Sequence, residues 1–237
     1  LWRTARRSVP ATLGWPMIFE LFDPKAEYVA GEGCNLPHWY QPGVTYFVTF
    51  RTEDSIPTHL ASQWRRRRDT WLRQHGIDCR EPYRKTELSR LSRAHLQEFH
   101  ETFSRDFLEY LDRGYGACVL KNPELSAMVA DSLRHFDGDR YVMGDFVVMP
   151  NHVHLLVGLL GDTEIVAQCK SWKKFTAREI NRRLGQKGRF WQEESFDHLV
   201  RSPEQFEAIQ RYIADNPREA RLRDTDFYYW KRPQQKA

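Results

Sequence analysis

The sequence predicts an α+β fold built around a mostly antiparallel sheet. Segments rich in β-branched and aromatic residues alternate along the chain with segments whose apolar residues recur at helical spacing. Residues 140–159 are almost continuously strand-like and are interrupted only at Met149-Pro150-Asn151. This pattern indicates two adjacent antiparallel strands joined by a tight bend. Strands and helices mixed in this way, with a hairpin among them, are typical of a compact α+β domain.

The first part of the chain contains an expected arm, strand and helix. Residues 1–42 are rich in Pro, Gly and isolated aromatic residues without a clear period, so we expect an irregular N-terminal arm. The segment Val44–Thr52 is β-branched and aromatic and predicts the first strand. Ser55-Ile-Pro57 then provides a helix cap and an early proline, which predicts a helix that runs towards Gln74 and is stopped by Gly76.

The middle and the end of the chain continue this alternation. A long helix is expected over about residues 87–113, because its apolar residues recur at helical spacing and two glycines follow it. Further elements are expected in this order: a short strand over Ala117–Leu120, a helix from Pro123 to about Phe136, the hairpin, a helix over about Thr163–Leu184, a Gly-rich loop over 185–188, strand-like segments at Phe190–Gln192 and Phe196–Arg201, and a helix from Pro203 to about Asn216.

Composition limits the possible function only loosely. Lys and Arg exceed Asp and Glu by 36 to 32 in 237 residues, and the isoelectric point of about 8.9 suits a nucleic-acid partner without establishing one. The cysteines stand far apart with no C-x-x-C spacing, which disfavours a zinc knuckle or a disulfide framework. No apolar stretch approaches the roughly 18 residues of a membrane span. We therefore expect a cytoplasmic protein that does not contact a membrane.

The first chemical motif is a pair of histidines in the second strand of the hairpin. Successive side chains of a strand point to opposite faces, so His152 and His154 share one face with about 6.6 Å between their Cα atoms. Val153, Leu155 and Val157 then face the core on the other side. Two imidazoles at this separation can converge on one divalent ion. The alternative is two histidines that merely alternate in a half-exposed strand.

The second motif lies in the last predicted helix, which begins with the capping-box sequence Ser202-Pro-Glu-Gln205. Tyr212 and Asn216 are four residues apart and are therefore neighbours on one helix face. A phenol becomes an effective nucleophile when a metal withdraws charge from the scissile phosphate, and Asn216 could lend its amide oxygen as the third metal ligand. The alternative reading makes the tyrosine an edge-of-core residue and the asparagine before Pro217 a helix stop.

Together these motifs resemble the single-tyrosine transposases of the His-hydrophobic-His (HUH) class. More specifically, they resemble the tyrosine transposases associated with repetitive extragenic palindromes (REP). The resemblance rests on Gly43–Phe50, Val148–Val157, Ser171–Asn181, Phe190–Gln192, Phe196–Arg201 and Tyr212–Pro217, and it extends over about residues 40–222. It implies one transposase domain over 43–222, in which the helix at about 87–113 is an insertion found in longer members, followed by a C-terminal tail over 223–237.

The resemblance also implies a fold, a cofactor and an activity. The fold is a ferredoxin-like α+β core, with the histidine pair on a central strand and Tyr212 on the last helix. A Mg²⁺ or Mn²⁺ ion is held by His152, His154 and Asn216. Tyr212 attacks a phosphate of single-stranded DNA at a palindromic hairpin, which leaves a 5′-phosphotyrosine and a free 3′-OH. We expect such a protein to associate with the nucleoid and to act as a monomer or a homodimer.

Basic side chains are candidate DNA contacts. In the predicted helix over about 163–184, four of them repeat at four-residue spacing and predict a ridge at the rim of the active site: Lys170, Lys174, Arg178 and Arg182. Lys173 is a candidate for reaching the scissile phosphate, and Arg65 and Arg66 extend the basic surface on the first helix. The alternative for all of them is a solvated helix face.

For other candidates near the motifs we expect roles outside metal binding and catalysis. We expect His198 to be structural or to contact DNA rather than to bind a metal, and Asp145 to face solvent or an edge of the sheet. Trp172 and Trp191 could stack on bases, but tryptophan at apolar spacing is more often part of a core.

Two other functions remain open from the sequence. One is a replication-initiation or relaxase-like nuclease with the same two-histidine platform. The other is a DNA-hairpin-binding protein that keeps the fold without the chemistry. A covalent adduct between Tyr212 and DNA separates the enzymes from the binding protein.

Overall fold

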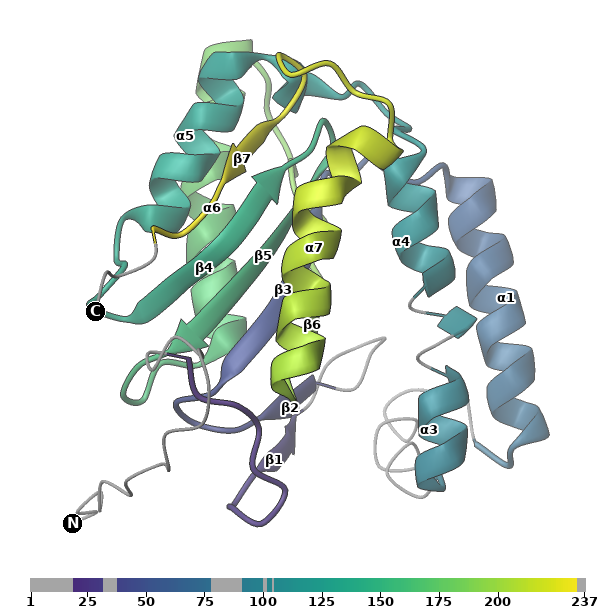
Figure 1. Ribbon diagram of the computed structural model, residues 1–237. Coiled ribbons are helices and arrows are strands. Elements are labelled where there is room, and N and C mark those ends of the chain that lie inside the picture. Colours follow the sequence, from purple (N-terminus) through teal and green to yellow (C-terminus); the bar gives the residue numbers. More distant parts are fainter. Residues whose placement is uncertain (1–18, 32–37, 78–90, 100–101, 104, 234–237) are drawn as a thin grey trace.

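The computed structural model describes residues 19–31, 38–77, 91–99, 102–103 and 105–233. At its centre lies a five-stranded antiparallel sheet in the order β6-β3-β5-β4-β7 (Figure 1). The strands are β3 (Thr45–Arg51), β4 (Tyr141–Val148), β5 (His152–Leu159), β6 (Phe196–Leu199) and β7 (Tyr228–Trp230). The predicted α+β fold with a mostly antiparallel sheet is confirmed.

Helices cover both faces of this sheet. Helices α5 (Pro123–Arg134) and α6 (Ile165–Leu184) pack on one face, and α7 (Pro203–Glu219) packs on the other (Figure 1). The elements β3, α5, β4, β5, α6 and β6 follow one another as strand, helix, two strands, helix, strand, and the first of these strands pairs with both the third and the fourth. This is the arrangement of a ferredoxin-like core, as the resemblance implied.

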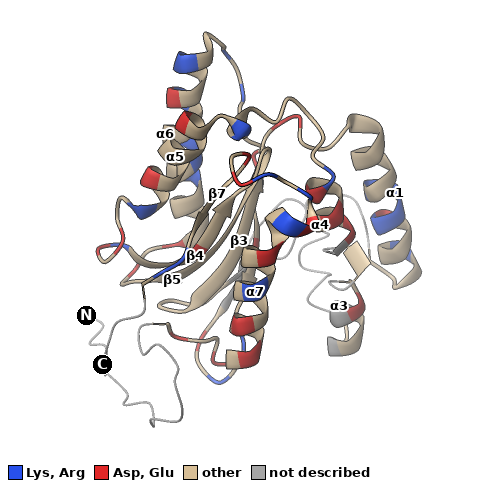
Figure 2. Cartoon of the chain, turned by 45° about the horizontal axis from the view of Figure 1, so that its top comes forward, with Lys and Arg blue, Asp and Glu red and all other residues tan. Residues whose placement is uncertain are grey.

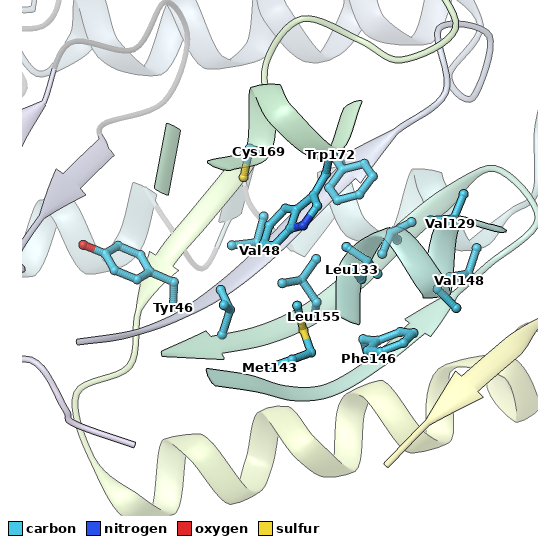
Figure 3. Close-up of a cluster of buried hydrophobic side chains, with 14 of the residues drawn as sticks. Tyr46, Val48, Val129, Leu133, Met143, Phe146, Val148, Leu155, Cys169 and Trp172 are labelled. Atoms are coloured by element: carbon cyan, nitrogen blue, oxygen red, sulfur yellow. The ribbon is translucent and has the colours of Figure 1, made fainter. Parts of the chain in front are cut away.

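The sheet buries apolar side chains on both faces. On the side of α5 and α6, β3, β4 and β5 bury Val48, Phe146 and Leu155 against Val129, Leu133 and Trp172, as Figure 3 shows. Trp191 joins the same cluster, so both tryptophans are core residues, as expected. On the other side Phe47 and Leu156 pack against Phe206 and Ile213 of α7. The strands are therefore fixed from two directions.

A separate cluster holds the helices beside the sheet. Helix α1 (Thr58–Gln74) buries Trp64 and Leu72 against residues of α3 (Arg93–Phe99) and of the segment leading into α4 (Arg105–Asp112). Within the expected helix over about 87–113 the described residues form α3 and α4, while residues 87–90, 100–101 and 104 lie outside the described part of the chain. The side chain of Trp64 donates a hydrogen bond to the carbonyl of Phe103 between them (3.1 Å).

Helix α1 also starts later than the sequence predicted. The residue before it, Pro57, makes no capping hydrogen bond through a side chain. The hydroxyl of Ser55 donates instead to the carbonyl of Thr52 (2.8 Å), so Ser55 closes a turn after β3 and does not cap the helix. Gly76 ends the helix in the left-handed region (φ +75°), as predicted.

Three other elements differ from the prediction. The expected strand at Ala117–Leu120 is a turn of 3₁₀ helix at Val119–Lys121, because Leu120 donates its N–H to the carbonyl of Pro150 (3.1 Å) and Cys118 is left-handed. The expected strand at Phe190–Gln192 is reduced to a single bridge between Trp191 and Thr52. In the tail expected over 223–237, β7 adds a fifth strand to the sheet, and its Trp230 ring stacks on Phe146.

Part of the N-terminal segment packs against the domain. Within the arm expected to be irregular, β1 (Val29–Gly31) pairs with β2 (His38–Tyr40), and Phe19 is buried against α7. Residues 1–18 and 32–37 of this arm lie outside the described part. Cys118 and Cys169 are free thiols, while the other two cysteines, Cys34 and Cys79, are not among the described residues. None of the described helices is long and apolar enough to span a membrane.

Candidate functional site

The histidine pair lies on the face of the sheet that is covered by α7. In β5 the side chains alternate, so Val153, Leu155 and Val157 enter the core on the side of α5 and α6, as predicted. His152 and His154 point the other way and are completely buried. Their partners across the strand on β3 are Arg51 and Thr49. The expected common face of the two histidines is confirmed.

Hydrogen bonds fix both imidazole rings. The Nδ1 atom of His152 lies 2.7 Å from Oδ1 of Asn151, whose amide nitrogen donates to the carbonyl of Tyr115 (2.8 Å). Because Oδ1 can only accept, Nδ1 of His152 donates, and its Nε2 keeps a lone pair. The Nδ1 atom of His154 is held by the hydroxyl of Thr49 at 2.7 Å. The two Nε2 atoms face each other at 2.9 Å.

Burial keeps these imidazoles neutral. It lowers the pKa of His152 to about 3 and that of His154 well below its ordinary value, and the neighbouring imidazole lowers the latter further. Neutral imidazole is the form that binds a metal ion, and a hydrogen bond from the opposite ring nitrogen is the usual support of a ligating histidine. Two ligand atoms about 2.1 Å from one ion are about 3 Å apart at a right angle. The Nε2 pair matches this separation.

Helix α7 brings the tyrosine to the histidines. Its first turn is fixed by the side chain of Ser202, which accepts from the N–H of Gln205, and by Pro203 at the first helical position. The hydroxyl oxygen of Tyr212 then lies 3.3 Å from Nε2 of His154. Its ring packs edge-on against Phe47 (5.9 Å between centroids), which limits the directions the phenol can take. Burial, and then the charge of Asp112, raise the pKa of Tyr212 above its ordinary value, so the phenol is protonated at neutral pH.

Asn216 completes the group of predicted residues. It is fully buried one turn after Tyr212. Its amide nitrogen donates to Oδ1 of Asp112 (3.1 Å), whereas its own Oδ1 is buried without a hydrogen-bond partner among the described residues. A buried carbonyl oxygen without a donor is costly unless a cation or a water satisfies it. The possible ligand atoms present, two imidazole nitrogens and an amide oxygen, therefore suit a divalent cation.

Two charged residues at the site were not anticipated. Asp112, the last residue of α4, places Oδ1 3.5 Å from Nε2 of His152, and burial raises its pKa to about 6. Arg51, at the end of β3, lies beside His152, and its guanidinium stacks over the ring of Phe107 (5.5 Å). Burial lowers the pKa of Arg51 to about 10, which leaves it positive at neutral pH. No motif spacing marks either residue, and only its position at the end of a predicted strand or helix could have drawn attention to it.

Acidic residues lie on the elements around the site. In Figure 2 the cartoon of α4 and α7 is red at several acidic positions, with basic positions between them on α7, while α1 carries basic residues. Glu109 and Glu219 lie near enough to raise the pKa of Asp112 further. Such a field attracts a cation and repels a bare phosphate.

The predicted basic ridge is not at the rim of this site. Helix α6 packs on the side of α5, across the sheet from the histidine pair, so the expected position of Lys170, Lys174, Arg178 and Arg182 was wrong. Lys173 is buried, and its ammonium donates to the carbonyls of Gln192 and Glu193 (3.2 and 2.6 Å). Arg66 is exposed on α1, whereas Arg65 lines a pocket of about 340 Å³ together with Arg51. Whether these residues contact DNA stays a prediction.

The two remaining candidates, His198 and Asp145, make hydrogen bonds that connect elements of the fold. Nε2 of His198 accepts hydrogen bonds from the side chains of Gln205 (2.8 Å) and Arg201 (3.2 Å) and so links β6 to the start of α7. Asp145 does not face solvent or an edge, as we had expected, but is only 2% exposed. A bulge in β4 after Met143 turns it inward, where it accepts from the N–H of Arg232 (3.0 Å) and from Gln210 (3.4 Å).

The chain matches one family model and resembles solved structures. The family model described as "Transposase IS200 like" matches residues 124–216. A solved structure described as a REP-associated tyrosine transposase bound to a REP hairpin is 16% identical over 77% of this chain and 71% of its own, with a TM-score of 0.41. A putative transposase from Deinococcus radiodurans R1 is 16% identical over 75% of this chain and 93% of its own, with a TM-score of 0.32. No curated protein matches the chain.

Proposed function

We propose that this chain is a metal-dependent enzyme that cuts and rejoins single-stranded DNA through Tyr212. The match of residues 124–216 to the IS200-like transposase family model supports nuclease and strand-transfer activity at a general level. The roles of individual residues, the metal and the DNA target are parts of the proposal.

One observation carries the proposal. The hydroxyl oxygen of Tyr212 lies 3.3 Å from Nε2 of His154, which faces Nε2 of His152 at 2.9 Å, although the residues come from β5 and α7. Asn216, one turn after Tyr212, has a buried amide oxygen without a hydrogen-bond partner among the described residues. A structural role explains the burial of such groups but gives no reason for a tyrosine hydroxyl beside two adjacent imidazoles. A nucleophile beside a set of cation ligands explains both.

The cation in this proposal is Mg²⁺ or Mn²⁺, held by His152, His154 and Asn216. When bound, it neutralises charge on the scissile phosphate and makes the phosphorus more open to attack. The hydrogen bonds from Asn151 and Thr49 keep the two imidazoles in place before the cation arrives.

Tyr212 supplies the nucleophile. Its hydroxyl oxygen attacks the phosphorus as it loses its proton, the bond from phosphorus to the 3′ oxygen breaks, and that oxygen leaves as a 3′-OH after taking up a proton. The product is a 5′-phosphotyrosine that conserves the phosphodiester bond energy. Attack by a 3′-OH on this intermediate reverses the step and rejoins DNA. Phe47 keeps the phenol directed at the site throughout.

The DNA partner is single-stranded DNA with a palindromic hairpin, a target that follows from the resemblance of the sequence motifs. Arg51 and Arg65 lie nearest the site and are suited to contact the phosphates beside the cut. The exposed cations of α6 and Arg66 are suited to hold DNA farther away: Lys170, Lys174, Arg178 and Arg182. The role of Lys173 in this proposal is indirect: its ammonium holds the backbone carbonyls of Gln192 and Glu193 in place.

The polarity of the covalent adduct tests this proposal. Hairpin DNA carrying single-stranded flanks is incubated with the protein and Mn²⁺, with the label at the 3′ end in one sample and at the 5′ end in another. We expect the 3′-labelled strand to migrate with the denatured protein and the 5′-labelled strand to be released shortened. Tyr212→Phe should form no adduct, whereas the control Tyr28→Phe, which changes an exposed tyrosine, should behave as the wild type.

The other outcomes separate the rival functions. An adduct that survives Tyr212→Phe refutes the assigned nucleophile. Binding of several hairpins without adduct or cleavage refutes the enzyme and supports a hairpin-binding protein. Cleavage that is independent of the hairpin supports a nuclease of the replication-initiation type.

A further inference from the structure

We infer that Asp112 of α4 is the fourth protein ligand of the cation site and also the residue that orients Asn216. This inference rests on the proposed metal-dependent function. It assigns a role to a helix that lies outside residues 124–216, the segment that matches the transposase family.

The distances are those of a shared ligand sphere. Oδ1 of Asp112 lies 3.5 Å from Nε2 of His152, and the ligand atoms of Asp112, His152 and His154 all lie within 4.8 Å of one another. Ligands about 2.0–2.2 Å from one ion are about 3–4 Å apart in octahedral or tetrahedral geometry. The present spacing therefore requires only a small contraction around an ion.

Hydrogen bonding does not account for the short contact between Asp112 and His152. Nδ1 of His152 donates to Asn151, so the Nε2 atom that lies 3.5 Å from Oδ1 of Asp112 carries a lone pair and no proton. A carboxylate oxygen and an imidazole lone pair repel each other, since both are acceptors. A cation between them satisfies both at once.

Asp112 also supplies the charge that the other ligands lack. The two imidazoles and the amide of Asn216 are neutral, and a site made of them alone leaves the two charges of a bound cation uncompensated. Mg²⁺ and Mn²⁺ prefer carboxylate oxygens, and two histidines with one carboxylate form a common site for divalent metals. The carboxylate therefore favours these ions.

The second role of Asp112 is to direct the amide of Asn216. Oδ1 of Asp112 accepts from Nδ2 of Asn216 (3.1 Å), which turns Oδ1 of Asn216 the other way, where it finds no donor among the described residues. The amide is thus held with its oxygen free for a cation.

Helix α4 is anchored well enough to place a ligand. Leu111, the residue before Asp112, is fully buried, and Phe107 packs on Trp64 of α1 (5.9 Å between ring centroids). An ion pair between Asp106 and Arg67 (2.7 Å) joins the same two helices. The helices beside the sheet therefore form one wall of the site.

Binding of Mn²⁺ to the DNA-free protein, measured by isothermal titration calorimetry, tests the inference. Asp112→Asn keeps an oxygen that can accept from Asn216 but removes the charge, and we expect it to weaken Mn²⁺ binding about 10- to 100-fold. The matched control is Glu109→Gln, which removes an exposed carboxylate from the same helix and should change the affinity by less than about threefold. Circular dichroism melting shows that each variant folds.

A third variant separates this inference from the proposed function. His154→Ala should abolish Mn²⁺ binding if the proposed site is correct, and undiminished binding refutes the metal site as a whole. If His154→Ala loses binding while Asp112→Asn binds as tightly as Glu109→Gln, the role of Asp112 is refuted and the proposed function stands. If Asp112→Asn fails to fold, Asp112→Ser replaces it: Mn²⁺ binding at least about tenfold weaker than in Glu109→Gln supports a ligand, and binding as tight as in Glu109→Gln refutes it.

Discussion

The two faces of the central sheet bury different kinds of side chain. Towards α5 and α6, β3 and β5 present an unbroken apolar surface that includes Val48, Phe50 and Leu155. Towards α7, the same two strands present Thr49 and His154 among apolar residues, together with other buried polar groups. Both surfaces belong to the same two strands, and they differ because successive side chains of a strand point to opposite faces of the sheet.

This difference shows how the protein keeps stability and chemistry apart. The apolar face fixes the position of β5 to the precision of close packing. The face under α7 can then bury polar groups, because Nδ1 of each imidazole has a hydrogen-bond partner while Nε2 is left for a ligand. Substitutions on neighbouring residues of β5 should therefore have separable effects.

The largest expected effect comes from the face under α7. His154→Ala removes one ligand and the neighbour of the Tyr212 hydroxyl. Adduct formation should fall about a thousandfold, because stabilisation by a bound cation is worth several kcal/mol and each tenfold in rate corresponds to about 1.4 kcal/mol. Single-turnover measurement of the adduct with saturating DNA checks this. Cleavage within tenfold of the wild-type rate would mean that His154 is not a ligand.

The next residue along the strand should show the opposite behaviour. Leu155→Ala leaves a cavity in the core under α5 and α6 and should lower the free energy of unfolding by about 2–5 kcal/mol. Guanidinium denaturation measures the loss. Adduct formation per folded molecule should stay within severalfold of wild type at a temperature well below the melting point. A folded Leu155→Ala protein without activity would show that the two faces are not independent.

The sequence correctly predicted those features of the two faces that depend on residues close together in the chain. Alternation along the strand placed His152 and His154 on one face, and a capped helix with a spacing of four residues placed Tyr212 beside Asn216. Each of these depends on residues close together in the chain. The agreement in type and order of the main elements has the same origin, because long periodic segments carry their own pattern.

Features decided by tertiary contacts could not be predicted in this way. Asp112 reaches His152 from 40 positions earlier in the chain, and only the packing of α4 on α1 brings it there. The side of the sheet taken by α6 depends on the crossover between strands, so the basic ridge was placed at the wrong face. The strands β1, β2 and β7 are three residues long, which is too short for a period to show.

Asp145 gives the smallest expected effect and the subtlest test of the polar face. It is buried on the α7 side, but its hydrogen bonds come from Arg232 and Gln210 and not from the proposed metal ligands. Burial raises its pKa above the ordinary value of 3.8, although the N–H of Arg232 opposes this. The folded protein thus holds the proton more tightly than the unfolded chain. The ionised group therefore costs stability above the folded pKa, and this cost disappears as the pH falls below it.

Asp145→Asn removes this cost and keeps an oxygen that can accept from Arg232. We expect the variant to be more stable than the wild type at pH 8 by less than about 1 kcal/mol, with the difference shrinking as the pH is lowered towards 4. Guanidinium denaturation at several pH values measures it. The control Asp131→Asn changes an exposed carboxylate of α5 and should shift stability by a few tenths of a kcal/mol. A less stable Asp145→Asn at pH 8 would mean that the hydrogen bonds to the carboxylate outweigh its burial, so that this part of the polar face is built to hold a charge.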